Sequence, residues 1–209
     1  MEPPRIYCSG PLFCAEEVGG MSAIAAILEG AGFQAFLPHR DGIEAYVLRF
    51  ARTPLASTLP GLRARLDYAM FSLDAYELIE RCDAVVGNLN GRVPDEGMIV
   101  EATLAYAAAK PLVLFKDDVR APFGGYDNAM LTSLTHGKIV RKLRELPAAL
   151  KNEMSRRREL APLSDDLRRA ISYGRRISSA LKSLPDNLGK KRWSEEILSG
   201  VLDAALKGD

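Results

Sequence analysis

Short apolar runs alternate with longer segments of helical periodicity through most of the chain. Residues 62–81 show the clearest helical pattern, because their apolar side chains recur every three or four positions. Other helical patterns cover residues 15–30, 42–52 and 128–134, and the stretch from Asp95 to just before Lys110. The runs that predict β-strands are residues 5–8, 33–37, 84–89, 112–115 and 138–140.

This order of elements indicates the fold class. Strands that alternate with helices predict right-handed βαβ units, and therefore a parallel sheet with helices on both faces. From about residue 147 the chain becomes charged and helical, without a further β-like run. We expect an α/β domain over residues 1–146, built on a five-stranded parallel sheet, and a helical C-terminal extension over residues 147–209.

Composition and charge exclude several classes of function. The 209 residues carry a net charge of +1, and the short basic clusters have acidic neighbours, so we expect no nucleic-acid partner. No apolar run approaches the roughly 18 residues of a membrane-spanning helix, so we expect no membrane partner. Three cysteines, an odd number, and the lack of a secretory leader favour the cytoplasm. No cysteine or histidine spacing predicts a metal site.

Two carboxylates follow the predicted third strand. The strand at residues 84–89 leads into the turn Pro94-Asp95-Glu96-Gly97, and the helix that follows carries Glu101 in its second turn. Ligands of open α/β sheets bind at the carboxyl ends of the strands, which is where this arrangement puts Asp95 and Glu101. Carboxylate pairs catalyse glycosyl transfer, one acting as the nucleophile and the other as the acid or base.

Both carboxylates also have a structural interpretation. In an ideal helix Glu101 shares a face with Met98, Leu104, Ala105 and Ala108, and we expect this face to pack on the sheet. A carboxylate there is costly unless it has partners or a function, and the alternative is a solvated position at the edge of the face. Asp95 also suits a helix N-cap, a role that is compatible with acid/base chemistry.

The first predicted strand ends in three further candidates, Tyr7, Ser9 and Gly10. Gly10 would allow a ligand to approach the backbone closely, and Tyr7 could orient a carboxylate, although Tyr7 could equally be a core residue. Asp74 lies inside the long helix at 62–81, where a solvated face is the alternative to a function. No dinucleotide, triphosphate or serine-hydrolase motif is present in the sequence.

Taken in order, these segments resemble the nucleoside 2-deoxyribosyltransferase family, which includes nucleotide N-glycosidases. The resemblance covers roughly residues 5–140 and implies a flavodoxin-like (Rossmann-like) fold. No single segment is specific, but the ordered set is. The matching segments are residues 6–13, 32–38, 82–86, 90–101, 105–107 with 110–111, and 128–130.

The resemblance implies a role for each residue. It places the family's nucleophile on Glu101, its acid/base on Asp95 and the tyrosine that contacts the nucleophile on Tyr7. The aspartate that helps to hold the sugar hydroxyl falls on Asp74. The asparagine that reaches a neighbouring subunit's site falls on Asn128, which implies a homo-oligomer. The remaining expected substrate-binding residues are Ser9, Gly10, Gly97, Met130, His39 and Arg40.

The implied activity is transfer of deoxyribose from a 2′-deoxynucleoside to another nucleobase or to water, through a covalent ester on Glu101 and without a metal or organic cofactor. A first alternative is a 2′-deoxynucleoside 5′-monophosphate N-glycosidase, because Ser9 and Arg40 could both contact a phosphate, whereas Asn128 suits a free 5′-hydroxyl. A second is a non-catalytic nucleotide-sensing module. One departure is Ala102, where the family often has glycine directly after the nucleophile.

Overall fold

The computed structural model describes residues 2–44, 62–91, 93–120, 126–156, 162–185 and 195–206. The chain divides into two units. Met1–Leu37 and Leu78–Pro162 form the first unit, and Pro38–Glu77 and Leu163–Asp209 form the second. The boundary expected at residue 146 stays a prediction.

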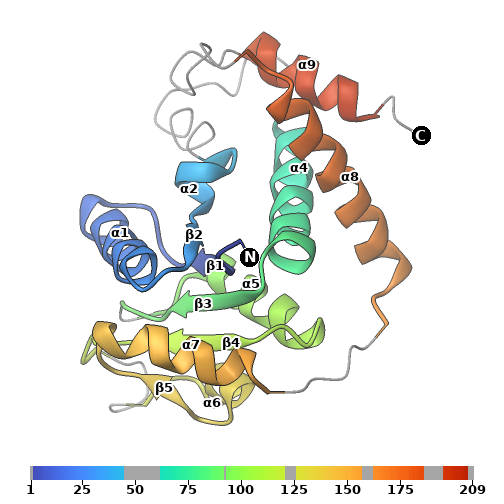
Figure 1. Cartoon of the computed structure of the whole chain (residues 1–209). Coiled ribbons are helices and arrows are strands. Elements are labelled where there is room, and N and C mark those ends of the chain that lie inside the picture. The colour runs from blue at the N-terminus through green and yellow to red at the C-terminus, as the bar shows by residue number, and fades with distance from the viewer. Residues whose placement is uncertain are drawn as a thin grey trace. The chain divides into compact units, whose positions relative to one another are not determined.

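Five parallel strands form the sheet of the first unit (Figure 1). They are β1 (Arg5–Ser9), β2 (Gln34–Phe36), β3 (Ala84–Asn88), β4 (Leu112–Phe115) and β5 (Ile139–Val140). Their order across the sheet is β2-β1-β3-β4-β5, so the order reverses between β1 and β3. This is the flavodoxin-like arrangement, and the predicted fold class is confirmed.

Helices cover both faces of this sheet. They are α1 (Ala15–Gly30), α5 (Glu96–Ala107), α6 (Ala129–Thr132) and α7 (Leu146–Met154), with the short turns η3 (Ser133–Thr135) and η4 (Leu143–Glu145). Apolar side chains of α1 and α7 join Ile6 and Cys8 of β1 in one buried cluster. Apolar side chains of α5 join Tyr7 in a second cluster on the opposite face. Both faces of β1 are therefore buried, which explains its continuous apolar sequence.

The second unit is helical. Its elements are α2 (Pro38–Asp41), α4 (Leu62–Tyr76), α8 (Asp165–Lys182) and α9 (Glu195–Leu206), and α4 continues into the π-helical turn η2 (Glu77–Arg81). Helices α4 and α8 approach most closely at Gly174. A Cβ atom on Gly174 would lie 1.9 Å from the carbonyl oxygen of Ser72, so only glycine allows the two backbones to come this close.

Replacing Gly174 by alanine should destabilise this helix pair by about 1–3 kcal/mol, because the methyl group would meet backbone rather than a movable side chain. The matched control is Gly200→Ala in α9, where a Cβ atom meets nothing within 4 Å. Alanine there should stabilise the helix by about 0.5–1 kcal/mol. Thermal and urea unfolding monitored by circular dichroism measure both changes. Equal stability of the two variants would contradict the close contact.

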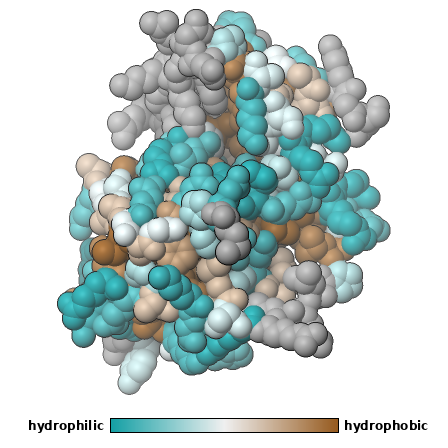
Figure 2. All heavy atoms as spheres, viewed as in Figure 1, coloured by the Kyte–Doolittle hydropathy of each residue, from teal (hydrophilic) through white to brown (hydrophobic). Residues whose placement is uncertain are grey.

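The secondary structure follows the sequence pattern closely. All five predicted strands are present within one or two residues, and helices form where residues 15–30, the segment after Asp95 and residues 128–134 predicted them. The predicted helix at 62–81 is α-helical as far as Tyr76 and π-helical after it. Of the helical pattern at 42–52, residues 45–52 lie outside the described residues. Figure 2 shows hydrophilic residues over most of the visible face, with hydrophobic ones in scattered areas between them. None of the helices in the described ranges is both long and apolar enough to cross a bilayer.

Candidate active site

The strand order reverses between β1 and β3, and the candidate residues follow or end these strands. Open α/β sheets bind their ligands at such a point. Ser9 ends β1, and Asn88 ends β3. The helix that follows β3 along the chain is α5, which carries Glu101 and packs on the sheet face to which Tyr7 points.

Glu101 is held by two hydroxyl groups of β1. The Tyr7 hydroxyl donates a hydrogen bond of 2.7 Å to Oε1 of Glu101, and the Ser9 hydroxyl donates one to Oε2. Tyr7 and Ser9 are two residues apart on one strand, so their side chains point to the same face. Hydrogen bonds at both oxygens fix the orientation of the carboxylate.

Glu101 lies at the edge of the buried face of α5. Met98, Ala102 and Ala105 are buried against the sheet, whereas Glu101 is half-buried. Met98, Ala105 and Ala108 of the predicted face are buried, and Glu101 lies at the edge of this face with both oxygens hydrogen-bonded to β1. A residue at the edge of this face can meet donors of β1 on one side and a ligand on the other.

Asp95 is the N-cap of α5. Its Oδ2 accepts a hydrogen bond of 2.7 Å from the backbone N–H of Met98. This satisfies one of the four N–H groups that a helix start leaves without partners. Gly97 lies in the same turn, where a Cβ atom would come within 3.2 Å of Asp95 Oδ2. The second oxygen, Oδ1, is left to accept or donate elsewhere, so capping and proton exchange are compatible.

Gly10 follows Ser9 in a confined position. A Cβ atom on Gly10 would lie 2.6 Å from the sulfur of Met21 and 2.8 Å from Cβ of Asn88. Asn88 is buried and accepts a hydrogen bond from the backbone N–H of Asn90. The glycine thus lets the ends of β1 and β3 approach α1, which shapes the carboxyl edge of the sheet beside Glu101.

The other predicted site residues belong to other elements. Asp74 in α4 and His39 and Arg40 in α2 belong to the second unit, and their roles stay predictions. Asn128 is the N-cap of α6, with its Oδ1 accepting a hydrogen bond of 2.9 Å from the N–H of Met130. Met130 is 82% exposed. The structure thus brings together Tyr7, Ser9, Gly10, Asp95, Gly97 and Glu101 around β1 and the start of α5.

The loops after β3 and β4 are joined to each other. Asn90 accepts hydrogen bonds from the N–H groups of Asp117 and Asp118, and Asp118 accepts one from the N–H of Gly91. The guanidinium of Arg120 beside Asp118 holds the pKa of that carboxyl well below its usual range. The contact with Arg120 therefore favours the charged form of Asp118, which accepts the hydrogen bond from Gly91.

A buried ion pair lies at the end of β4. Nζ of Lys116 is 2.5 Å from Oδ1 of Asp127, and the two side chains are only 1% and 2% exposed. Asp127 immediately precedes the N-cap Asn128, so the pair fixes the start of α6 to the end of β4. Sequence reasoning missed this pair, although a lysine directly after an apolar strand and an aspartate before an N-cap are visible in the sequence.

Among the residues that the structure describes, no group of three or more histidine, cysteine, aspartate or glutamate side chains is arranged to hold a metal ion.

The comparisons with known proteins cover the first unit and extend into the second. A family model described as nucleoside 2-deoxyribosyltransferase matches residues 6–130, more than half of the chain. Among solved structures, a conserved protein from Enterococcus faecalis V583 aligns with a TM-score of 0.53 and 18% identity, over 72% of this chain and 98% of its own. A 2-deoxyribosyltransferase from Bacillus psychrosaccharolyticus aligns with a TM-score of 0.48 and 21% identity, over 77% and 99%. The likeness to the Enterococcus faecalis protein shows only that the two proteins share a fold. No curated protein matches the chain.

Proposed function

Because the chain belongs to the nucleoside 2-deoxyribosyltransferase family, we propose that it cleaves the N-glycosidic bond of 2′-deoxynucleosides and transfers the deoxyribose to another nucleobase or to water. The observation that carries the proposal is the double hydrogen bond from Tyr7 and Ser9 to Glu101 at the switch point of the sheet. A carboxylate that is oriented at both oxygens suits a nucleophile, because attack needs a fixed direction.

The proposed first step forms an ester. An oxygen of Glu101 bonds to the anomeric carbon while the bond from that carbon to the base nitrogen breaks, and the bonding electrons leave with the base. Asp95 supplies the proton that the departing base takes up. The positive charge that develops on the sugar in the transition state is stabilised by the carboxylate itself.

The second step reverses the first with a new acceptor. Asp95, now ionised, removes a proton from the incoming base or from water, and the acceptor bonds to the anomeric carbon as the ester bond to Glu101 breaks. Two displacements at one carbon give net retention of configuration.

A monophosphate N-glycosidase remains the alternative, and one observation bears on it. The Ser9 hydroxyl, one of the two groups that could meet a 5′-phosphate, is buried and donates to Glu101. This favours a free 5′-hydroxyl over a phosphate at β1. The homo-oligomer is likewise a proposal, supported by the exposure of Met130 beside Asn128.

The direct experiment is chromatography of the purified protein after incubation with deoxyinosine and adenine, and separately with deoxynucleoside 5′-monophosphates without an acceptor. New deoxyadenosine establishes base exchange and supports the proposal. Free base from the monophosphates alone would make the protein a hydrolase of nucleotides. Binding of these compounds without any product would instead favour a nucleotide-sensing module.

Replacing Asp95 by asparagine should separate its two roles. Asparagine caps a helix as well as aspartate does, so the midpoint of unfolding should stay unchanged. Asparagine cannot exchange a proton, so the rate of deoxyinosine cleavage should fall on the order of 10²-fold. Asp95→Ala should lose the cap as well and lower the free energy of unfolding by about 1 kcal/mol. Wild-type rates in the asparagine variant would remove Asp95 from the mechanism.

A further inference from the structure

A cavity whose lining does not include Glu101 lies in the first unit. Its volume is about 290 Å³, and it is lined by the ends of α5 and α7, the start of β4 and the turn after η3. Lys110 and Leu112 lie at the start of β4, and Lys138 directly precedes β5. Because the strands are parallel, these residues mark the amino edge of the sheet, opposite the carboxyl edge where Glu101 lies.

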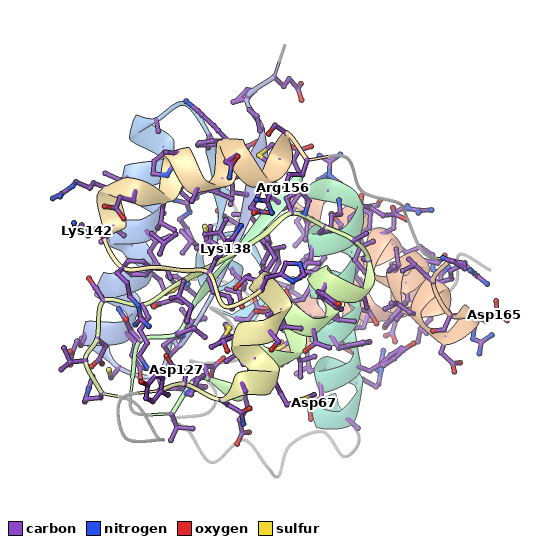
Figure 3. All side chains as sticks on the ribbon, turned by 90° about the horizontal axis from the view of Figure 1, so that it is seen from below. Asp67, Asp127, Lys138, Lys142, Arg156 and Asp165 are labelled. Atoms are coloured by element: carbon purple, nitrogen blue, oxygen red, sulfur yellow. The ribbon has the colours of Figure 1, made fainter. Side chains whose placement is uncertain are left out.

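Positive charge predominates around this cavity. Lys110, Lys138 and Arg156 line it together with a single acid, Glu153. Arg156 forms an ion pair of 2.9 Å with Glu153, and Nζ of Lys110 donates to the carbonyl oxygen of Cys82. Burial lowers the pKa of Lys110. Figure 3 shows Arg156 at one end of α7 with Lys138 below it, whereas Lys142 lies at the other end of that helix.

Helix dipoles account for part of this charge. Lys110 follows the C-terminus of α5 and Arg156 follows that of α7, and cations stabilise the partial negative charge at helix C-termini. They do not account for Lys138, which precedes a strand. Lys138 is exposed and adds a third cation at the rim of the cavity.

The backbone around the cavity adopts left-handed conformations that glycine usually takes. In the described parts of the chain, the two non-glycine residues with positive φ are Ala109 and His136, each at 54°. Ala109 precedes Lys110, and His136 itself lines the cavity. Both residues close a helical turn, because the N–H of Lys110 bonds to the carbonyl oxygen of Ala105 and the N–H of Gly137 bonds to that of Thr132. The ends of α5 and η3 thus define the shape of this side of the cavity.

Part of the remaining wall is apolar, beside the polar side chains of Thr135 and Asn152. Leu112, Val113 and Ala149 contribute aliphatic side chains, and the ring of Tyr106 is 55% exposed. An apolar wall with a few convergent polar groups is the usual composition of a small-molecule site. The volume matches a ligand of one ring with one charged group rather than a whole dinucleotide.

The geometry points to a binding site for a small phosphate monoester with an aromatic body at the amino edge of the sheet. Lys138 and Arg156 hold the phosphate, and Tyr106 and the aliphatic wall hold the ring. The cavity is separate from Glu101, so occupation does not compete with a nucleoside at the carboxyl edge.

The test is a titration of the full chain with phenyl phosphate, followed by proton NMR. Phenol and inorganic phosphate, which each carry one half of this ligand, are titrated separately. The sequence has two histidines, His39 and His136, so the imidazole signal of His136 can be assigned from a His136→Gln variant. Phenyl phosphate should shift this signal saturably and bind at least about tenfold more tightly than either half, because both contacts are made at once.

A matched pair of variants locates the binding. Lys138→Glu with Arg156→Glu should weaken phenyl phosphate binding at least about tenfold, since charge-assisted hydrogen bonds are lost and repulsion is added. Lys142→Glu with Arg144→Glu makes the same change of charge outside the cavity, and its affinity should remain within about twofold of wild type. The inference is overturned by an unmoved His136 signal, by equal weakening in both variants, or by displacement of phenyl phosphate with deoxyinosine.

Discussion

Replacement of Glu101 by glutamine should reduce base exchange by on the order of 10⁴-fold or more while the chain stays folded. Glutamine has the same shape and can still form hydrogen bonds with the hydroxyls of Tyr7 and Ser9, so the packing of α5 should be kept. Its neutral carboxamide oxygen is a far weaker nucleophile than a carboxylate and does not form the ester. Initial rates of deoxyadenosine formation from deoxyinosine and adenine measure the loss.

Mass spectrometry of the intact protein adds a direct readout of the intermediate. Wild-type protein quenched soon after mixing with deoxyinosine should gain the mass of one deoxyribosyl group, and the Glu101→Gln variant should not. The matched control is Glu96→Gln, which makes the same change of charge at an exposed position in the first turn of α5. Retained activity in Glu101→Gln, or equal loss in the control, would exclude Glu101 as the nucleophile.

Replacement of Lys116 by methionine should lower the free energy of unfolding by about 3–5 kcal/mol, because it leaves the carboxylate of Asp127 buried without its counter-charge. Both side chains are almost completely inaccessible to water, so solvent cannot take over the role of the lysine. Urea unfolding measures the change. The variant should also loosen α6, whose N-cap directly follows Asp127.

A double-mutant cycle isolates the pair. Lys116→Met combined with Asp127→Leu should recover most of the lost stability, because two apolar groups of similar volume need no counter-charge. The control is Lys142→Met, which removes one partner of an exposed pair with Glu145 and should cost no more than about 1 kcal/mol. A single Lys116→Met variant as stable as this control would show that the buried pair contributes nothing.

The strands were predictable because both faces of the sheet are buried. A strand such as β1 then consists almost wholly of apolar residues and stands out against the helical periodicity around it. The π-helical turn at Glu77–Arg81 was not predictable, because its side chains continue the same apolar spacing as the α-helix before it. The close contact of Gly174 with Ser72 depends on a partner about a hundred residues away, which local patterns do not reveal.

The candidate site was predictable in part. A turn that ends in aspartate before a helix indicates an N-cap, and Asp95 forms one. The contact of Tyr7 with Glu101 came from the family resemblance, because no periodicity relates residues 94 positions apart. A separation of 92 residues likewise hides the Ser9 contact. Lys116 and Asp127 are only 11 residues apart, but no periodicity relates them, since the partner of a buried charge is set by tertiary packing.

The order of elements along the chain constrains how the protein folds. Ser178 donates a hydrogen bond to Glu77 across 101 residues, and Arg65 pairs with Asp203 across 138. The three large helices of the second unit thus meet only after β3, β4 and β5 have been synthesised between them. Closing such long loops is slow unless the intervening chain is already compact. We expect the sheet to form first. Its formation shortens the distance between the chain segments on either side of it, so that α8 and α9 can then pack with α4.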